Sequence, residues 1–264
     1  MRTHLWLDLP LGAGAIAGGL TLGWPIAAGC TALVVALNAW GVVSPRSSLY
    51  LPVHWRLPGK SPVIALTYDD GPDPDSTPAL LELLAQHGAQ ATFFVIGSQV
   101  RRHPEIVRRI RVAGHALGIH SDQHSHSFNL WSRSRVEADL SACADSIAQA
   151  TGEPPPRLFR PPIGLKNPII GGVIKRSGLT CVTWSVGGGD SHRRSVAILT
   201  RRYLRRLIRG SIVLLHDGQD PAAPQPRPHL LPLTRALLER AAQCGFGARG
   251  LCPTADGVGT IADA

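Results

Sequence analysis

Strand-like and helix-like segments alternate between residues 63 and 243, and this alternation restricts the fold more than any other feature. Short apolar runs typical of buried strands occur near 63–68, 91–96, 115–119, 157–160, 179–184 and 211–215. Segments with helical periodicity follow them, near 77–87, 104–113, 134–150, 167–177, 195–209 and 229–243. Strands and helices repeated in this way predict a parallel sheet covered by helices. The number of units fits a (β/α) barrel better than an open sheet.

The N-terminal part of the chain has the composition of a membrane segment. Asp8 is the only formally charged residue between positions 5 and 43, and this stretch is longer than the apolar core of a signal peptide. Trp24-Pro25 divides it, because proline starts helices readily and interrupts them poorly. We therefore predict a transmembrane segment over 1–43 with two helices, about 5–23 and 26–43. A single kinked helix is the alternative.

Composition also indicates the other boundaries and the kind of partner. Residues 44–62 are rich in proline and glycine and predict a juxtamembrane linker, followed by a main domain over 63–250 and a C-terminal tail over 251–264. The formal charge of +9 comes mostly from arginines on predicted helices, with few aromatic residues among them. This favours membrane lipid over nucleic acid as a partner. The five cysteines form no Cys-x-x-Cys pair, so we expect free thiols.

Two adjacent carboxylates stand at the end of the first predicted strand. The run over 63–68 leads directly into Asp69 and Asp70, and Gly71-Pro72 ends the strand after them. Neighbouring residues of an extended chain point to opposite sides, so one carboxylate can bind a cation while the other faces a reacting water. For the tetrapeptide alone, an ordinary acidic turn is the alternative.

His120 and His124 follow the apolar run 116–119 and lie four residues apart. This spacing can bring both imidazoles to one face, where they can bind one divalent metal together with a carboxylate. His126 leaves an ambiguity, because His124 and His126 can also pair on an extended backbone.

Three further predicted strands end in residues that suit a site. Arg160 precedes two prolines, which fix the backbone and thereby aim the guanidinium. The strand ending at Trp184 is followed by a glycine-rich turn up to Asp190, and the last strand ends at His216. A structural proline turn and a flexible loop are the alternatives for the first two. Because barrel enzymes carry catalytic groups at their strand ends, we expect all five strand ends to contribute to one site.

Taken in chain order, these motifs resemble those of the polysaccharide deacetylases, the NodB-homology or carbohydrate esterase 4 family, over about residues 60–250. The family's Thr-Phe-Asp-Asp-Gly-Pro is similar to residues 67–72, with tyrosine for phenylalanine, and its His-Ser/Thr-x-x-His is similar to residues 120–124. The resemblance implies an α/β fold, a distorted and incomplete TIM-like (β/α) barrel, here preceded by the transmembrane hairpin. It also implies a hydrolase that removes N-acetyl groups from N-acetylhexosamine units without an organic cofactor.

The resemblance implies a role for each of the main polar residues. Asp70, His120 and His124 would bind a divalent metal, with zinc expected. Asp69 would be the general base, and His216 would be the general acid.

Supporting roles follow from the same resemblance. Arg160 would orient the base, and the backbone amide of Ile163 would face the oxyanion even though the family often has tyrosine there. Leu214 would line the acetyl-methyl site, with Trp184 grouped in the same substrate pocket. Asp190 would tune the acid, although the family has a tryptophan directly after this aspartate and the present chain has serine.

The predicted substrate is an N-acetylated carbohydrate: a polysaccharide, peptidoglycan or a lipid-linked saccharide. A deformylase or cyclic-amide hydrolase on the same fold is one alternative, and a catalytically silent, membrane-anchored carbohydrate-binding module is another. Arg2 flanks the first predicted span, while Arg46, Arg56 and Lys60 follow the second. We predict a bacterial plasma-membrane protein, and the positive-inside tendency predicts that its main domain is cytoplasmic. A single span with an external domain is the alternative.

Overall fold

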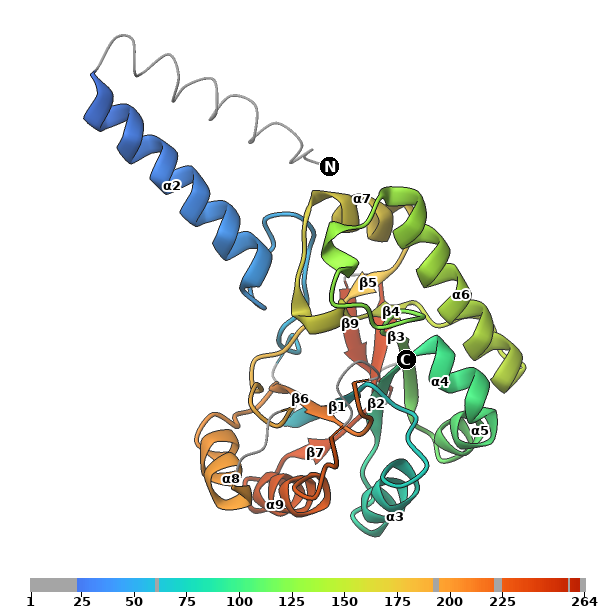
Figure 1. Ribbon diagram of the computed structural model, residues 1–264. Helices are drawn as coiled ribbons and strands as arrows, with labels where there is room; N and C mark the ends of the chain where they lie inside the picture. Colours follow the sequence, from blue (N-terminus) through green and yellow to red (C-terminus); the bar gives the residue numbers. More distant parts are fainter. Residues whose placement is uncertain (1–22, 60–61, 192–194, 221–224, 256, 262–264) are drawn as a thin grey trace.

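The computed structural model describes residues 23–59, 62–191, 195–220, 225–255 and 257–261. Within these ranges a curled parallel sheet is surrounded by helices (Figure 1). Six strands lie in the order β5-β4-β3-β2-β1-β6, and β7 pairs with the start of β1. Their bounds are β1 Val63–Asp69, β2 Ala91–Val95, β3 Ala116–Ile119, β4 Leu158–Phe159, β5 Thr180–Cys181, β6 Ile212–His216 and β7 Gly247–Ala248. The predicted parallel (β/α) architecture is therefore confirmed.

Helices connect the strands on the outside of the sheet. They are α3 Thr77–Gln86, α4 Gly97–Arg102, α5 Pro104–Val112, α6 Arg133–Thr151, α7 Pro168–Arg176, α8 Val196–Leu204 and α9 Leu230–Gln243, with two short 3-10 turns, η1 Phe128–Leu130 and η2 Pro162–Gly164. Local sequence explains where some of these helices begin and end. The Ser132 side chain accepts a hydrogen bond from the Arg135 amide at the start of α6, and Gly152 ends this helix in the left-handed conformation.

The barrel is distorted because single bridges, rather than a regular strand, lie between β5 and β6. His54 pairs with Val182 just beyond β5, and Val186 pairs with Val213 of β6. Residues from the segment 44–62 therefore contribute to the wall of the barrel. After the sheet, a separate antiparallel hairpin follows, β8 Leu251–Thr254 and β9 Gly257–Thr260.

Both faces of the sheet are buried, which explains the unbroken apolar runs in its strands. Tyr68 and Phe93 stack with ring centroids 5.2 Å apart in the layer between sheet and helices. Phe94, the next residue along β2, belongs to the second cluster on the other face. The register of β1 and β6 sets Asp69 opposite His216, so the carboxyl ends of these two strands lie at one level.

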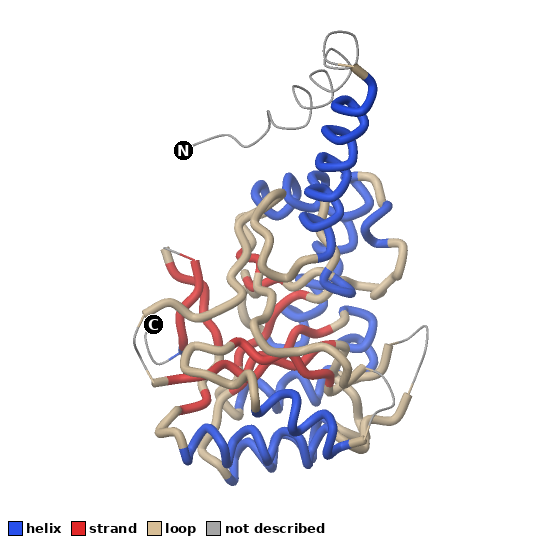
Figure 2. Tube along the Cα trace, turned by 90° about the vertical axis from the view of Figure 1, so that its left-hand side faces the viewer, coloured by secondary structure: helices blue, strands red, loops and turns tan. Residues whose placement is uncertain are grey.

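α2 (Trp24–Val43) projects away from the barrel (Figures 1 and 2). It has 20 residues, and an 18-residue window within it has a mean hydropathy of 1.9 and is almost entirely exposed, so by length and composition the helix could cross a membrane. At 1.5 Å per residue the helix is about 30 Å long, close to the thickness of a bilayer core. The other predicted span, 5–23, lies outside the described residues apart from Gly23.

Candidate active site

β1 delivers the two predicted carboxylates to the carboxyl edge of the sheet. Asp69 is its last residue, and Asp70 follows with a φ of 73°, in the left-handed region that few residues other than glycine adopt. Both side chains are buried. Asp69 Oδ1 accepts a hydrogen bond of 2.7 Å from Arg160, whereas Asp70 Oδ1 faces His120 and His124. The two adjacent aspartates thus have different partners.

The three predicted metal ligands, Asp70, His120 and His124, come together. The Nε2 atoms of His120 and His124 lie 3.5 and 3.3 Å from Asp70 Oδ1. All three side chains are buried, and within the described chain Asp70 Oδ1 has no hydrogen-bond partner. Zinc bonds to imidazole nitrogen and carboxylate oxygen are about 2 Å long, which suits a cation placed among these three atoms. The residues therefore fit a divalent metal.

The backbone fixes the orientation of His120. Its Nδ1 lies 2.9 Å from the carbonyl oxygen of Arg160 and donates a hydrogen bond to it, so Nε2 is the ring nitrogen that faces Asp70 and could bind a metal. The His124 amide donates to Ser121 Oγ at 2.8 Å, which closes the turn between the two histidines. With the turn closed, the two imidazole rings lie 5.0 Å apart.

Electrostatics keep Asp70 ionised. Burial alone would raise the pKa of this carboxyl, but the neighbouring imidazoles of His120, His216 and His124 outweigh it and hold the pKa below its usual range. For His124, burial and the nearby His120 lower the pKa and favour the neutral imidazole. For His120, burial is outweighed by the carboxylates of Asp69 and Asp70, which raise the pKa, so a metal would have to displace a proton from this ring. Ionised carboxylate and neutral imidazole are the forms that bind a metal.

Arg160 is fully buried and donates hydrogen bonds to four groups, one of which is Asp69. Its Nη1 donates to Asp69 Oδ1 at 2.7 Å and to Thr67 Oγ1 at 2.8 Å. Nε and Nη2 donate to the carbonyl oxygens of Val182 and Thr183, at 3.2 and 3.1 Å. A guanidinium held in this way leaves Asp69 Oδ2 as the oxygen that can take a proton.

The loop after Arg160 contains a residue in the left-handed conformation. Ile163 has a φ of 58°, and its side chain is half exposed. Gly164 lies directly on Trp184, since a Cβ atom there would be 2.5 Å from the indole ring. Leu214 and Trp184 also border Gly187, whose added Cβ would approach both within 3 Å. The three residues predicted for the substrate side, Ile163, Trp184 and Leu214, therefore belong to neighbouring segments.

His216 and Asp190 form a buried ion pair. His216 Nδ1 lies 2.9 Å from Asp190 Oδ2, and the other carboxylate oxygen accepts a hydrogen bond of 2.8 Å from Tyr203. Burial disfavours the imidazolium, but the Asp190 carboxylate outweighs it and raises the pKa of His216 to about 9. His216 is thus a protonated donor at neutral pH, with Nε2 directed away from Asp190.

Comparison with known proteins gives the same family as the motifs. The family model described as polysaccharide deacetylase matches residues 56–182. A peptidoglycan-N-acetylglucosamine deacetylase of Bacillus cereus is 37% identical over 168 residues, which cover 63% of this chain and 78% of that protein. The chain belongs to the polysaccharide deacetylase family. It is a hydrolase that acts on the N-acetyl amide bonds of polysaccharides.

Two further proteins are similar to this chain to a comparable degree. A chitooligosaccharide deacetylase of Azorhizobium caulinodans is 38% identical over 160 residues, covering 60% of this chain and 75% of that protein. Among solved structures, a family 4 carbohydrate esterase from Streptomyces lividans in complex with acetate superposes with a TM-score of 0.66 and 29% identity, over 75% of this chain and 97% of that one.

Two residues of this deacetylase site carry no signal in the sequence. The Tyr203 hydroxyl, on α8, donates a hydrogen bond to Asp190 and also to the Leu214 carbonyl at 3.0 Å. Arg227 donates to the carbonyls of Ser191 and Gly218, both at 3.0 Å, and its Nη2 lies 3.7 Å from Asp70 Oδ2. Both residues come from patterns that predicted only helix or loop, and their approach depends on tertiary packing.

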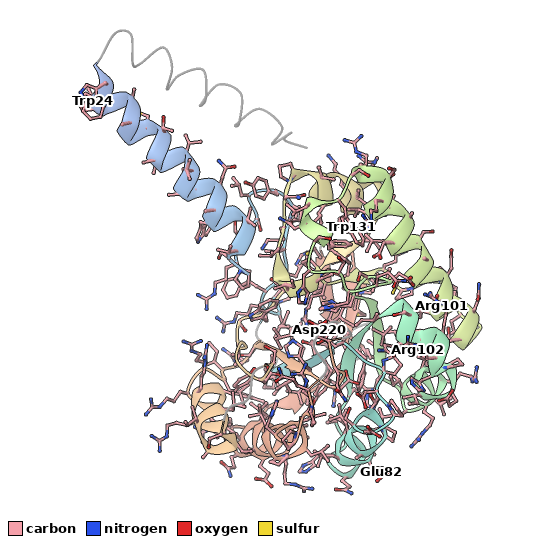
Figure 3. The ribbon with its side chains drawn as sticks, viewed as in Figure 1. Trp24, Glu82, Arg101, Arg102, Trp131 and Asp220 are labelled. Atoms are coloured by element: carbon pink, nitrogen blue, oxygen red, sulfur yellow. The ribbon has the colours of Figure 1, made fainter. Side chains whose placement is uncertain are left out.

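Asp220 is a third residue that sequence reasoning did not find. Its Oδ1 lies 3.5 Å from His124 Nδ1, and its Oδ2 lies 2.6 Å from His126 Nε2. Figure 3 shows Asp220 near the middle of the domain, far from Trp24 at the outer end of α2. His126 is thus outside the Asp70 cluster but belongs to a second group with His124 and Asp220. The sequence ambiguity over His126 has a structural counterpart.

Proposed function

We propose that this protein is a metal-dependent N-deacetylase that acts on N-acetylhexosamine units and is anchored to the plasma membrane by α2. The observation that carries the proposal is the buried Asp70 Oδ1, set between two imidazole nitrogens and without a hydrogen-bond partner in the described chain. Zinc is the metal we propose, because two nitrogens and one carboxylate oxygen are a common ligand set of catalytic zinc.

The chain's own residues account for the proton transfers of amide hydrolysis. Bound zinc would supply an activated water and polarise the acetyl carbonyl. Asp69 takes the proton of the attacking water at Oδ2, since Arg160 occupies Oδ1. His216 gives its Nε2 proton to the departing amine nitrogen, while Asp190 holds the opposite side of the ring.

Negative charge develops on the former carbonyl oxygen during attack. We assign the backbone N–H of Ile163 as its donor, because the proline pair fixes this peptide and its side chain turns outward. Leu214 and Trp184 would contact the acetyl methyl group. A small apolar contact of this kind suits acetyl, which distinguishes the proposed reaction from deformylation.

The relatives indicate the substrate class. Their names give peptidoglycan N-acetylglucosamine and chitooligosaccharides as substrates of those proteins. We propose an N-acetylated glycan for this chain, with a lipid-linked saccharide as the form that suits an enzyme held at the bilayer. The catalytically silent alternative is disfavoured, because the chain has all of the residues to which we assign the main roles: Asp69, Asp70, His120, His124, Arg160 and His216.

Metal analysis combined with acetate release tests this function. The full chain purified in detergent is expected to hold about one equivalent of zinc, and to release acetate from an N-acetylglucosamine oligomer. His124→Ala should lose both the metal and the activity, whereas His126→Ala should keep the metal. A wild-type protein that binds zinc but releases no acetate from any N-acetylhexosamine substrate would refute the proposed reaction.

The cytoplasmic location is a further part of this proposal. It rests on the basic residues that flank the two predicted spans. A fluorescent reporter fused after Ala264 should be active in cells, and an alkaline phosphatase reporter at the same point should be silent. Active phosphatase there would instead favour a single span with an external domain.

A further inference from the structure

The end of α2 is fastened to the loop that follows the proposed oxyanion donor. Lys166 is completely buried, and its ammonium donates to the Ser44 carbonyl at 2.8 Å. Its backbone N–H donates to the Val42 carbonyl at 3.2 Å. A cation at the carboxyl end of a helix is favourable, because it faces the negative end of the helix dipole. Lys166 is only three residues after Ile163, the proposed oxyanion donor. The chain between them can span at most about 10 Å, so the end of α2 lies close to the proposed active site.

Several other contacts also hold the end of α2 against the barrel; together with the Lys166 bonds they form what we call the Lys166 joint. Tyr50 donates a hydrogen bond of 2.6 Å to the Asn38 side chain of α2, and Thr183 donates to the Pro45 carbonyl at 2.6 Å. Gly41 is buried because the chain returns over it; a Cβ atom there would lie 2.6 Å from Leu49. The helix therefore has a fixed direction relative to the barrel.

Three large apolar side chains are exposed close to this joint. Leu130 is 85% exposed, Ile163 is 52% exposed and Ile169 is 40% exposed. They lie on η1, on η2 and in the first turn of α7. Asn167, next to Lys166, donates a hydrogen bond of 2.6 Å to the Asn129 carbonyl, which brings η1 beside the start of α7. Each of these three side chains is therefore within a few residues of Lys166, which contacts the end of α2, or of the hydrogen bond between Asn167 and Asn129.

Positive charge accompanies these apolar side chains. Arg133 and Arg135 are exposed in the first turn of α6, directly after Leu130. The Arg135 guanidinium lies 4.0 Å above the ring of Trp131, so it is held at this surface rather than extended into solvent. Figure 1 shows α2 leaving the domain on the same side as α7 and the start of α6, and Figure 3 labels Trp131 there. Apolar side chains together with arginines are typical of surfaces that rest on anionic lipid.

We propose that these five residues, Leu130, Ile163, Ile169, Arg133 and Arg135, form a rim patch that rests on the surface of the bilayer spanned by α2. The apolar side chains enter the boundary between headgroups and acyl chains, and the arginines contact anionic headgroups. The inference rests on the anchoring part of the proposed function and does not depend on the reaction. It places the opening of the active site at the membrane surface.

Depth measurements on the full chain in lipid nanodiscs test the rim patch. Nitroxide labels would be attached to Leu130→Cys and Ile169→Cys, with Cys30 and Cys244 replaced by serine because both are exposed. Val112→Cys is the matched control, since Val112 is an aliphatic residue of α5 that is 89% exposed. Leu33→Cys reports on α2 itself. The nanodiscs contain phosphatidylcholine and phosphatidylglycerol, and power saturation compares collisions with oxygen and with a water-soluble nickel chelate.

The labels at 130 and 169 are expected to meet the nickel chelate at least about threefold less often than the label at 112, as interfacial groups do. Equal accessibility at 130, 169 and 112, with the label at 33 protected, would overturn the rim patch and leave the anchor intact. Free access of the chelate to the label at 33 would overturn both. Acetate release from a soluble oligosaccharide, measured on the same labelled variants, reports separately on the proposed reaction.

Discussion

Replacing Asp190 by asparagine is expected to change the pH dependence of the reaction more than the fold. Asparagine has the same shape, and its carbonyl oxygen can still accept the hydrogen bond from Tyr203. It has no negative charge, however, to stabilise the His216 imidazolium across 2.9 Å. Asp190 is the largest of the causes that raise this pKa, and Asp70 and Asp69 raise it further. Without Asp190, burial offsets what remains, and we expect the pKa of His216 to fall towards its ordinary value.

The size of the effect follows from the two pKa values. A raised pKa means that the proton-donating form is present at low pH and is lost as the pH rises through the folded value. At pH 8, a histidine with a pKa of about 9 is roughly 90% protonated, whereas one with the ordinary pKa of about 6.5 is roughly 3% protonated. The variant should therefore lose about thirtyfold in kcat/KM at pH 8 and less than about twofold at pH 6.

The assay is kcat/KM for acetate release between pH 5.5 and pH 10 in wild type, Asp190→Asn and Asp145→Asn. Asp145 is exposed on α6 and serves as the control for removing a carboxylate from the surface. The basic limb should move to lower pH only in Asp190→Asn. If the Asp190→Asn profile keeps the wild-type shape and is merely scaled down, then Asp190 does not set the protonation of the acid and this reasoning is wrong.

Two further substitutions test other parts of the site. Asp69→Asn should retain about one equivalent of zinc and lose 10²-fold or more in kcat, the scale of a general base; turnover within a few-fold of wild type would exclude Asp69 from that role. Asp220→Asn should weaken zinc binding by about 10- to 100-fold in a chelator competition, because Asp220 Oδ1 faces the Nδ1 of His124 and can hold its orientation. Asp75→Asn is the matched control, and two bound zinc ions in wild type that fall to one in Asp220→Asn would instead indicate a second metal site at His126.

Sequence reasoning found those parts of the site that lie on strand ends. Parallel strands align their carboxyl ends, so a motif after one strand lies near a motif after the next; the pairing of Asp69 with His216 is the direct result. The family resemblance supplied the roles, and the structure brings the proposed ligands Asp70, His120 and His124 together. Their roles stay predictions until the variants are measured.

Residues that reach the site from other elements could not be predicted in this way. Tyr203 lies on α8 and approaches Asp190 only because this helix packs beside β6, and no local pattern records that packing. Asp220 lies in a loop whose sequence is compatible with any turn. The contribution of His54 to the barrel wall was also invisible, because a single bridge needs no strand-forming run. Asp190 was doubtful in sequence, since its neighbour departs from the family, yet it is the residue that pairs with His216.

The buried Lys166 joint has a consequence for how the enzyme meets its substrate. A domain joined to its membrane anchor by a flexible linker can take many orientations and can reach substrates at many distances from the membrane. If α2 spans a bilayer as proposed, the hydrogen bonds from Lys166 to Ser44 and Val42 oppose tilting of the domain relative to that helix. The site would then stay within a thin layer parallel to the lipid, and its encounters with substrate would approach a two-dimensional search. Sugars that diffuse in that layer would be met repeatedly, whereas sugars held further from the lipid would be out of reach.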